Sequence, residues 1–243
     1  MKTAMTIAVL GATGMVGSRV ITEAGARGHQ VLALSRRPAS EDPKVKPIAV
    51  DATDSQAVHD ALAGSASNGA SNGASNGASN GASNGAADAV VLCVRTIPVD
   101  QEFLVGITRT VLDIGARLGI RVLVVGGAGA LRSPGDHDLL VADNPAYVPA
   151  ELETIAAAGV AQLRTCQAHA VADSVYLSPP ALLEPGERTG RYRRGTDTLL
   201  TSADGSSWIS AEDLAVAVVD ELETPGPEHH ITVAHDEGGG ECM

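Results

Sequence analysis

The chain has 243 residues, of which 44% are hydrophobic and only 2% aromatic, and its formal net charge is -12 at pH 7. This length allows one sizeable core built from Ala, Val, Leu and Ile. The negative charge argues against nucleic acid or an anionic membrane as a partner, because both would repel the protein. The sequence has no apolar run near the roughly 20 residues of a membrane span and no cleavable signal, so we expect a cytoplasmic protein.

Three cysteines, Cys93, Cys166 and Cys242, are spread along the chain. They show neither the close pairing of a zinc site nor the even, regular spacing of a disulfide framework. We therefore predict reduced thiols and no metal site.

Residues 7–20, with the sequence IAVLGATGMVGSRV, predict a strand, a phosphate loop and a helix. Gly11 allows a tight turn, Gly14 lets a pyrophosphate approach the backbone, and Gly17 lets the helix pack closely on the sheet. The free N–H groups and the dipole at the helix start would hold the anion. The alternative is a glycine-rich turn with a structural role only, but the buried strand before it and the amphipathic helix after it favour dinucleotide binding.

The end of the second predicted strand, residues 29–35, bears on the choice of cofactor. NAD-selective folds place an acidic residue there to accept from the ribose 2'-hydroxyl, whereas this chain has Ser35, Arg36 and Arg37. A hydroxyl followed by two guanidinium groups suits a 2'-phosphate, so we predict NADP(H) in preference to NAD(H). Two solvated surface arginines beside a turn are the alternative.

Asp51 ends a short third strand over residues 47–50 and precedes a helix predicted over residues 55–63. Two interpretations stay open for this carboxylate. It either lies beside the adenine ring of the cofactor or caps the helix.

Residues 66–85 are five successive copies of Ala-Ser-Asn-Gly. The tract has no apolar face, so it cannot bury enough surface to offset the entropy of ordering it. We predict a flexible insertion at the amino-terminal edge of the sheet, remote from the edge where ligands bind.

The fourth predicted strand, residues 88–94, is apolar throughout, and its C-terminal end, which carries Cys93, Val94, Arg95 and Thr96, is expected to face the cofactor cleft. A helix over residues 101–118 follows, with Phe103 on an apolar stripe that we interpret as core or as a dimer face. The protein is thus expected to be a monomer or a homodimer. The fifth strand, residues 121–125, runs into Gly126.

Residues 131–149 combine three prolines with polar side chains, including His137 and Tyr147, and we predict a loop that contacts a small-molecule substrate. A helix over residues 150–170 and a sixth strand over residues 174–177, ended by Ser178, come next.

A dense basic run at Arg188, Arg191, Arg193 and Arg194 indicates either a receptor for an anionic substrate or a solvated hairpin. Ser210 begins a further helix with a start typical of a capping box. A last strand covers residues 230–234. The single domain is expected to end at residue 236, and residues 237–243 to form a frayed tail.

Several segments together resemble an atypical branch of the short-chain dehydrogenase/reductase superfamily, the NADH-flavin-reductase-like or NAD(P)-binding branch. These segments are GATGMVGSRV, SRRP, VLVVGGAGAL, LSPPALLEPGERTGRYR and ISAEDLAVAVVDEL. The resemblance implies an α/β fold, a doubly wound and mainly parallel Rossmann sheet in a single domain with a small C-terminal region on the substrate side.

The resemblance also implies roles for individual residues. The pyrophosphate would be held by Gly11, Thr13, Gly14, Met15 and Val16, and the phosphate on the adenosine ribose by Ser35, Arg36 and Arg37. The nicotinamide would be flanked by Cys93, Gly126 and Ser178.

The chain departs from the superfamily at the catalytic positions. The fifth strand ends in glycines rather than Ser or Thr, the fourth residue after Tyr147 is Glu151, and no lysine follows Lys46. Carbonyl reduction by a Tyr/Lys pair is therefore not expected. We predict an oxidoreductase that passes hydride from NAD(P)H to a small conjugated, flavin-like or quinone-like acceptor.

In that reaction Tyr147 or His137 would supply a proton, although Tyr147 has an alternative role as an aromatic wall of the site. Two other functions stay open. One is a redox-neutral lyase or isomerase on the same scaffold, and the other is a non-catalytic dinucleotide sensor of the NmrA-like kind.

Overall fold

The central sheet has eight strands in the order β10-β12-β8-β5-β4-β1-β2-β3, and every neighbouring pair except β10 with β12 is parallel. The computed structural model describes residues 3–65, 85–169 and 173–236. The strands of this sheet are β1 (Thr6–Leu10), β2 (Gln30–Ser35), β3 (Val45–Ala49), β4 (Ala89–Leu92), β5 (Arg121–Val125), β8 (Ser174–Ser178), β10 (Tyr192–Gly195) and β12 (His230–His235).

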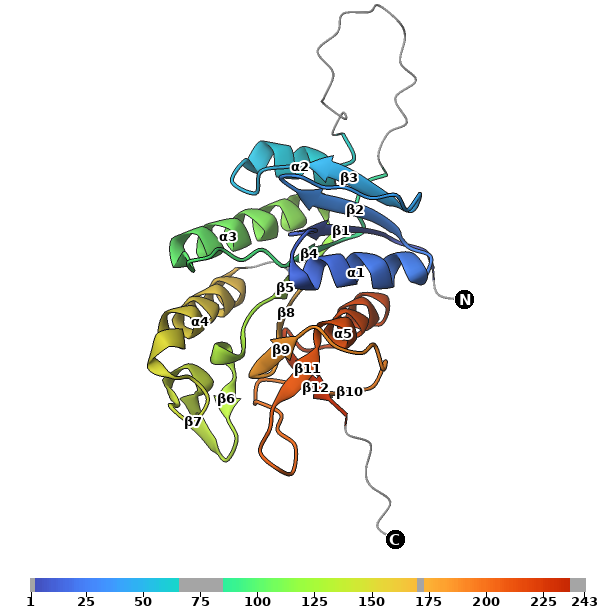
Figure 1. Cartoon of the computed structure of the whole chain (residues 1–243). Coiled ribbons are helices and arrows are strands. Elements are labelled where there is room, and N and C mark those ends of the chain that lie inside the picture. Colours follow the sequence, from blue (N-terminus) through green and yellow to red (C-terminus); the bar gives the residue numbers. More distant parts are fainter. Residues whose placement is uncertain (1–2, 66–84, 170–172, 237–243) are drawn as a thin grey trace, which may run out of the picture.

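Helices cover both faces of the sheet (Figure 1). They are α1 (Met15–Ala26), α2 (Ser55–Leu62), α3 (Gln101–Leu118), α4 (Glu153–Ala168) and α5 (Ala211–Glu223). The apolar side chains of α1 and α5 pack on one face, and those of α2, α3 and α4 on the other. This arrangement confirms the predicted doubly wound α/β fold, and its strand order reverses between β1 and β4, where such folds bind ligands.

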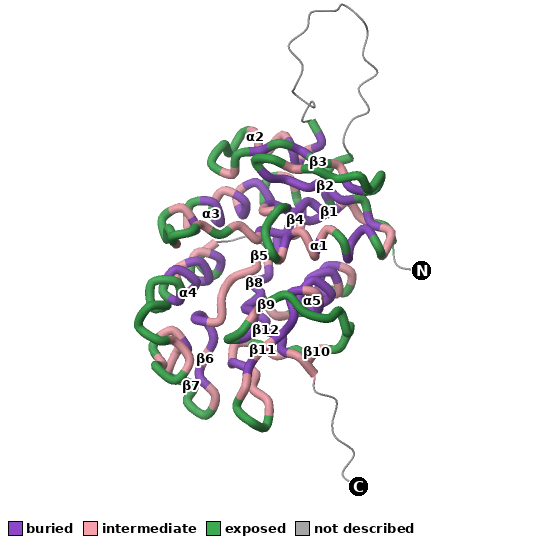
Figure 2. The backbone as a smooth tube through the Cα atoms, in the orientation of Figure 1, coloured by how far each residue is buried: buried purple, intermediate pink, exposed green. Residues whose placement is uncertain are grey.

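The central strands are buried on both faces, as Figure 2 shows by their colour. Val9 pairs in register with Ala33 of β2 and with Val91 of β4, and all three side chains belong to the core layer under α1 and α5. Ala8 and Leu10 alternate with them and pack in the opposite layer. The continuous apolar runs in the sequence reflect this double burial.

The segments beyond the central strands are more structured than the sequence indicates. The predicted loop 131–149 contains a ribbon of β6 (Arg132–Ser133) with β7 (Asp136–Leu140), and β9 (Leu182–Glu184) pairs with β11 (Trp208–Ser210). Three short 3-10 helices also occur in the described residues, η1 (Ala128–Ala130), η2 (Val141–Asp143) and η3 (Ala150–Leu152). The predicted helix over residues 150–170 thus starts as η3 and becomes α4 only at Glu153.

The capping box predicted for α5 is only half formed. The Ser210 hydroxyl accepts from the Asp213 N–H at 3.0 Å. The Asp213 carboxylate does not return to the cap residue, because it accepts instead from the Gly190 N–H at 2.7 Å and the Thr189 hydroxyl at 2.6 Å. It therefore holds the segment that precedes β10 against α5.

The two ends of the Ala-Ser-Asn-Gly tract are placed where the sequence predicts them. The Ala87 N–H donates to the Leu62 carbonyl at the end of α2, and the Asp88 N–H donates to the Thr6 carbonyl at the start of β1. Both contacts lie at the amino-terminal edge of the sheet. Residues 66–84 and the tail 237–243 lie outside the described residues, as do the calls made on them.

Within the part of the chain that the structure describes, no helix combines the length and the apolar character needed to cross a membrane.

Candidate cofactor site

The loop after β1 has a backbone that only glycine fits at two positions. Gly11 has a φ of 102°, and a Cβ there would lie 2.7 Å from the Cys93 carbonyl oxygen. A Cβ on Gly17 would lie 2.2 Å from the Gly11 carbonyl oxygen, so α1 approaches the loop as closely as its backbone allows. The structure thus places both glycines in the turn and the close helix packing that the sequence predicts for them.

The start of α1 has features of an anion site. Gly14 is the N-cap residue and contributes no side-chain hydrogen bond, and the first turn has no acidic residue. The N–H groups of Met15 and Val16 belong to this turn, whose donors have no partner inside the helix. These free donors and the positive end of the helix dipole together favour an anion at the start of α1.

A cleft of about 790 Å³ opens at this point. It combines the glycine loop with the segments that follow β2, β3 and β4. Eight of the predicted site residues line it: Gly11, Thr13, Gly14, Ser35, Arg36, Arg37, Asp51 and Cys93.

The end of β2 presents unsatisfied polar groups to the cleft. The Ser35 Oγ is buried and has no hydrogen-bond partner. Arg36 and Arg37 are exposed, and within the described ranges no hydrogen bond or ion pair involves either guanidinium. Because buried polar atoms are nearly always partnered in folded proteins, the Ser35 hydroxyl at the wall of the cleft is available to hydrogen-bond a ligand.

Asp51 does not cap α2. The cap is Asp54, whose carboxylate accepts from the Ala57 N–H at 3.0 Å. Asp51 instead accepts from the backbone N–H and the hydroxyl of Thr53, at 2.9 and 2.8 Å. These bonds hold the pKa of Asp51 below its usual range, so it lines the cleft as a carboxylate. Of its two interpretations, only the position beside the adenine stays a prediction.

Cys93 contributes its backbone and an inert thiol. The Sγ lies 3.4 Å from the Leu10 carbonyl oxygen, and it packs with the core layer under α1. Burial raises the pKa of this thiol to about 12, so it stays protonated at neutral pH. The side chain therefore packs beneath the glycine loop and is not a nucleophile at neutral pH.

Arg95, Thr96 and Phe103 also line the cleft. The sequence places Arg95 and Thr96 at the end of the fourth strand, facing the cleft as observed, whereas it assigns Phe103 to the core or to a dimer face. The Thr96 hydroxyl accepts from the Asp100 N–H at 2.8 Å, and Asp100 in turn caps α3 by accepting from the Phe103 N–H at 3.0 Å. These bonds fix the segment between β4 and α3. In the sequence, Phe103 has the same helical spacing as the core residues of α3. The one signal for the cleft is its position in the first turn of α3, close to the carboxyl end of β4.

Gly126 and Ser178 are not among the residues lining this cleft. A Cβ at residue 126 would lie 1.8 Å from the Tyr176 hydroxyl oxygen, which donates to the Gly159 carbonyl at 3.0 Å. The buried phenol thus occupies the space that a Ser or Thr side chain would need. The Ser178 hydroxyl is fully buried and lies 2.9 Å from the Nε2 of His230, whose pKa is lowered by burial.

The two predicted proton donors lie apart from the cleft. Tyr147 packs against a small apolar cluster made by Leu131, Val141 and Leu199. His137 is exposed on β7. The structure brings neither of them to the residues that line the cleft, and their catalytic roles stay predictions.

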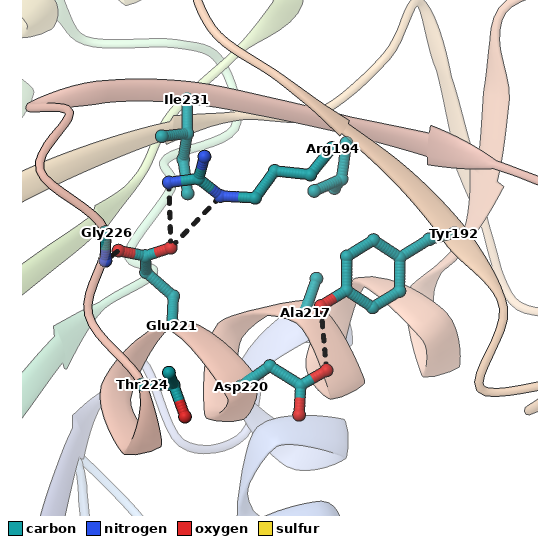
Figure 3. Close-up of a pocket in the computed structure, with 9 residues that line it drawn as sticks. Tyr192, Arg194, Ala217, Asp220, Glu221, Thr224, Gly226 and Ile231 are labelled. Atoms are coloured by element: carbon teal, nitrogen blue, oxygen red, sulfur yellow. Dashed lines mark hydrogen bonds and ion pairs between the residues drawn. The ribbon is translucent and has the colours of Figure 1, made fainter.

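Three arginines of the C-terminal basic run, Arg188, Arg193 and Arg194, are engaged within the protein, whereas the exposed Arg191 guanidinium has no hydrogen-bond or ion-pair partner among the described residues. Arg188 makes two hydrogen bonds to Glu23, at 2.7 and 2.8 Å. Arg194 pairs with Glu221 and Glu228, and a hollow of about 300 Å³ beside this pair is drawn in Figure 3. In the same view the Tyr192 hydroxyl points at the Asp220 carboxylate. The charged groups that line this hollow are thus paired with one another or with the rest of the chain.

No group of three or more His, Cys, Asp or Glu side chains suited to a metal ion occurs among the described residues.

Comparison with known proteins adds the family. A family model described as NAD(P)H-binding matches residues 11–225. The uncharacterized protein YwnB of Bacillus subtilis (strain 168) is 31% identical over 223 residues, covering 91% of this chain and 93% of YwnB.

Two solved structures resemble the whole chain. A putative exported protein from Burkholderia pseudomallei shares 33% identity with a TM-score of 0.78, over 95% of this chain and 100% of that one. A putative epimerase from Bacteroides thetaiotaomicron shares 30% identity with a TM-score of 0.79, over 97% and 99%. Together with the family match, these similarities confirm the predicted resemblance to atypical short-chain dehydrogenase/reductases with a nicotinamide dinucleotide site.

Proposed function

The chain belongs to the NAD(P)H-binding family, and we propose that it is an oxidoreductase that prefers NADP(H) and reduces a small conjugated, flavin-like or quinone-like acceptor. The observation that carries the cofactor preference is the buried, unpartnered Ser35 hydroxyl beside two unpaired arginines. A 2'-phosphate would accept from all three groups.

The rest of the cleft fits the same cofactor. The loop from Gly11 to Gly17 and the uncapped start of α1 would hold the pyrophosphate. The segments after β3 and β4, with Asp51 and Phe103, would enclose the adenosine.

The reduced nicotinamide supplies a hydride, and the residues in the cleft limit which acceptors suit it. The titratable side chains that line the cleft are three arginines, Asp51 and Cys93. At neutral pH the low pKa keeps Asp51 ionised and the high pKa keeps Cys93 protonated, so neither is a general acid near neutrality. Quinones and flavins take their proton readily from water, which is why we favour them over simple carbonyls.

A redox-neutral reaction is the second candidate, because one similar structure is called a putative epimerase. Such a reaction needs a protein acid or base close to the substrate, and the lining of the cleft supplies none that titrates near neutrality. A dinucleotide sensor needs no catalytic group and is the remaining alternative.

Turnover assays separate these functions. The protein is incubated with NADPH and a panel of flavins, quinones and enones while the absorbance of the reduced nicotinamide is followed. We expect its loss with at least one flavin or quinone. Tight NADPH binding without oxidation by any member of the panel would favour the sensor, and substrate conversion without net NADPH oxidation would favour the redox-neutral enzyme.

A further inference from the structure

Arg95 is the one cation of the cofactor cleft to which the proposed function gives no ligand group. Its side chain lines the cleft and is exposed, and its guanidinium has no hydrogen-bond or ion-pair partner among the residues that the structure describes. Arg95 follows β4, whereas Arg36 and Arg37 follow β2, and β1 lies between these two strands in the sheet. The cleft therefore has positive charge on both sides of the glycine loop.

Backbone contacts hold the segment that carries Arg95 against this loop. The Gly11 N–H donates to the Leu34 carbonyl at the end of β2, at 3.1 Å. On the other side, a Cβ at Gly11 would lie 2.7 Å from the carbonyl oxygen of Cys93, two residues before Arg95. The next residue is held as well, because the Thr96 hydroxyl accepts from the N-cap residue of α3 at 2.8 Å. The Arg95 backbone is thus fixed beside the loop, two strand spacings or about 10 Å from β2.

The cleft around Arg95 is partly apolar. Its apolar side chains come from the ends of β2, β3 and β4 and from the start of α3, and they are Leu34, Val50, Ala52, Val94 and Phe103. Phe103 also packs against the core layer under α2, α3 and α4, so its position is held by the fold. Apolar walls of this kind suit a flat ring rather than a phosphate. In the adenosine half of a dinucleotide, that ring is the adenine.

The chemistry of arginine fits the same part of the ligand. A guanidinium is planar and stacks on the face of an aromatic ring, in addition to pairing with phosphate. In the proposed binding mode both phosphate groups already have donors, the start of α1 for the pyrophosphate and the end of β2 for the 2'-phosphate. The adenine is left for the wall that carries Arg95 and Phe103.

We propose that the Arg95 guanidinium stacks on the adenine of the bound dinucleotide and determines how tightly the protein holds NADPH and NADH alike. The inference rests on the proposed function, because it assumes that a dinucleotide occupies the cleft. The arginines of the cleft then divide the work. Arg36 and Arg37 discriminate between the two cofactors, and Arg95 contributes to the affinity for both.

Calorimetric titration of the whole protein tests this without any turnover. The ligands are NADPH, NADH and adenosine 2',5'-bisphosphate, which has the adenosine half but no nicotinamide. The variants are Arg95→Ala and Arg95→Lys. Arg191→Ala is the matched control, since Arg191 is also an exposed arginine without a partner in the described ranges but does not line the cleft.

Arg95→Ala should weaken the binding of all three ligands by a common factor of about fivefold or more, within the range of a cation–π contact. The ratio of NADPH to NADH affinity should not change. Arg95→Lys should recover only a small part of the loss, because the ammonium keeps the charge but lacks the planar surface. Arg191→Ala should leave all three affinities unchanged. Both sites are exposed, so the variants should fold, and unchanged denaturant midpoints check this.

Three results would each overturn the inference. A loss confined to NADPH and the bisphosphate would place Arg95 on the 2'-phosphate. Full recovery by Arg95→Lys would show that it acts as a point charge on the pyrophosphate. Unchanged affinities in Arg95→Ala would show that the side chain is only solvated.

The same titrations separate the inference from the proposed function. Equal affinities for NADPH and NADH in the unmodified protein, together with a common loss in Arg95→Ala, would support the role of Arg95 and contradict the proposed preference for NADP(H). A clear preference for NADPH, with no loss in Arg95→Ala, would support that preference and contradict the role of Arg95.

Discussion

Two sets of arginines in this protein differ in whether other residues of the chain pair with them. Arg36 and Arg37, next to the glycine loop, have no hydrogen-bond or ion-pair partner among the described residues and line a cleft. Arg188 and Arg194, in the densest basic run of the sequence, are paired with buried carboxylates of other elements. Clustering of positive charge along the sequence therefore does not identify the ligand site; Arg36 and Arg37 are distinguished because they combine the lack of an internal partner with a place in the cleft beside the glycine loop.

Gly14→Val should have the largest effect of these changes, because it would prevent the cofactor from binding in the cleft beside Arg36 and Arg37. A Cβ at this position already lies 3.2 Å from the Gly11 carbonyl oxygen, and the branched side chain would also occupy the space where the pyrophosphate meets the backbone. We expect NADPH affinity to fall by more than about a hundredfold, or about 2.7 kcal/mol. Gly106→Ala, where the added Cβ meets nothing within 4 Å, is the matched control in calorimetry.

Removing both cleft arginines sharpens the comparison between the two sets. Each charge-assisted hydrogen bond contributes about 1.5 to 3 kcal/mol, so Arg36→Ala with Arg37→Ala should lower NADPH affinity at least about tenfold and leave NADH affinity nearly unchanged. Arg188→Ala should leave both affinities unchanged and lower stability instead. If Arg188→Ala weakened NADPH binding as much as the double variant, the distinction between the two sets would be wrong.

The ion pair between Arg188 and Glu23 should make the stability of the protein depend on pH. The hydrogen bond from Arg188 is the main cause that holds the pKa of Glu23 below its usual value of 4.5. A lowered folded-state pKa stabilises the protein above the unfolded pKa, and this contribution is lost as pH falls through the folded value. Glu23→Gln should therefore cost about 1 to 3 kcal/mol near neutrality and much less in acid, measured by denaturant unfolding at both pH values. A difference that stays constant down to acid pH would contradict this.

The smallest effects are expected at the two predicted proton donors. Neither Tyr147 nor His137 lines the cleft, so Tyr147→Phe and His137→Ala should leave NADPH affinity unchanged. Turnover should fall by less than the roughly 10²-fold to 10⁴-fold typical of a lost general acid. A larger loss in kcat, with KM unchanged, would show that one of them reaches the reacting atoms in the complex.

The sequence predicts the first half of the fold well because the information there is local. Glycine spacing and buried strand patterns predict β1, α1 and β2, and they predict that Ser35, Arg36 and Arg37 line the cleft. The pairing of the basic run was not predictable, since Glu23 lies 165 residues from Arg188 in the chain. The Tyr176 phenol behind Gly126 is a similar case, because only the register of β5 and β8 brings it there.

The sequence also predicts too little regular structure between β5 and β8 and after β8, again because contacts between distant segments decide it. β6 has only two residues, and its neighbour in space is the segment near Asp197, whose carbonyl accepts from the Arg132 N–H at 2.7 Å. Such short strands are fixed by contacts between distant segments rather than by their own propensity.

Calorimetric titration of the unmodified protein with NADPH and with NADH tests the central claim most directly. The unpartnered Ser35 hydroxyl and the two unpaired arginines require NADPH to bind at least about tenfold more tightly, a difference of about 1.4 kcal/mol. The preference should shrink as salt is raised, because the arginines are exposed to solvent. Equal affinities for the two cofactors at low salt would contradict the account.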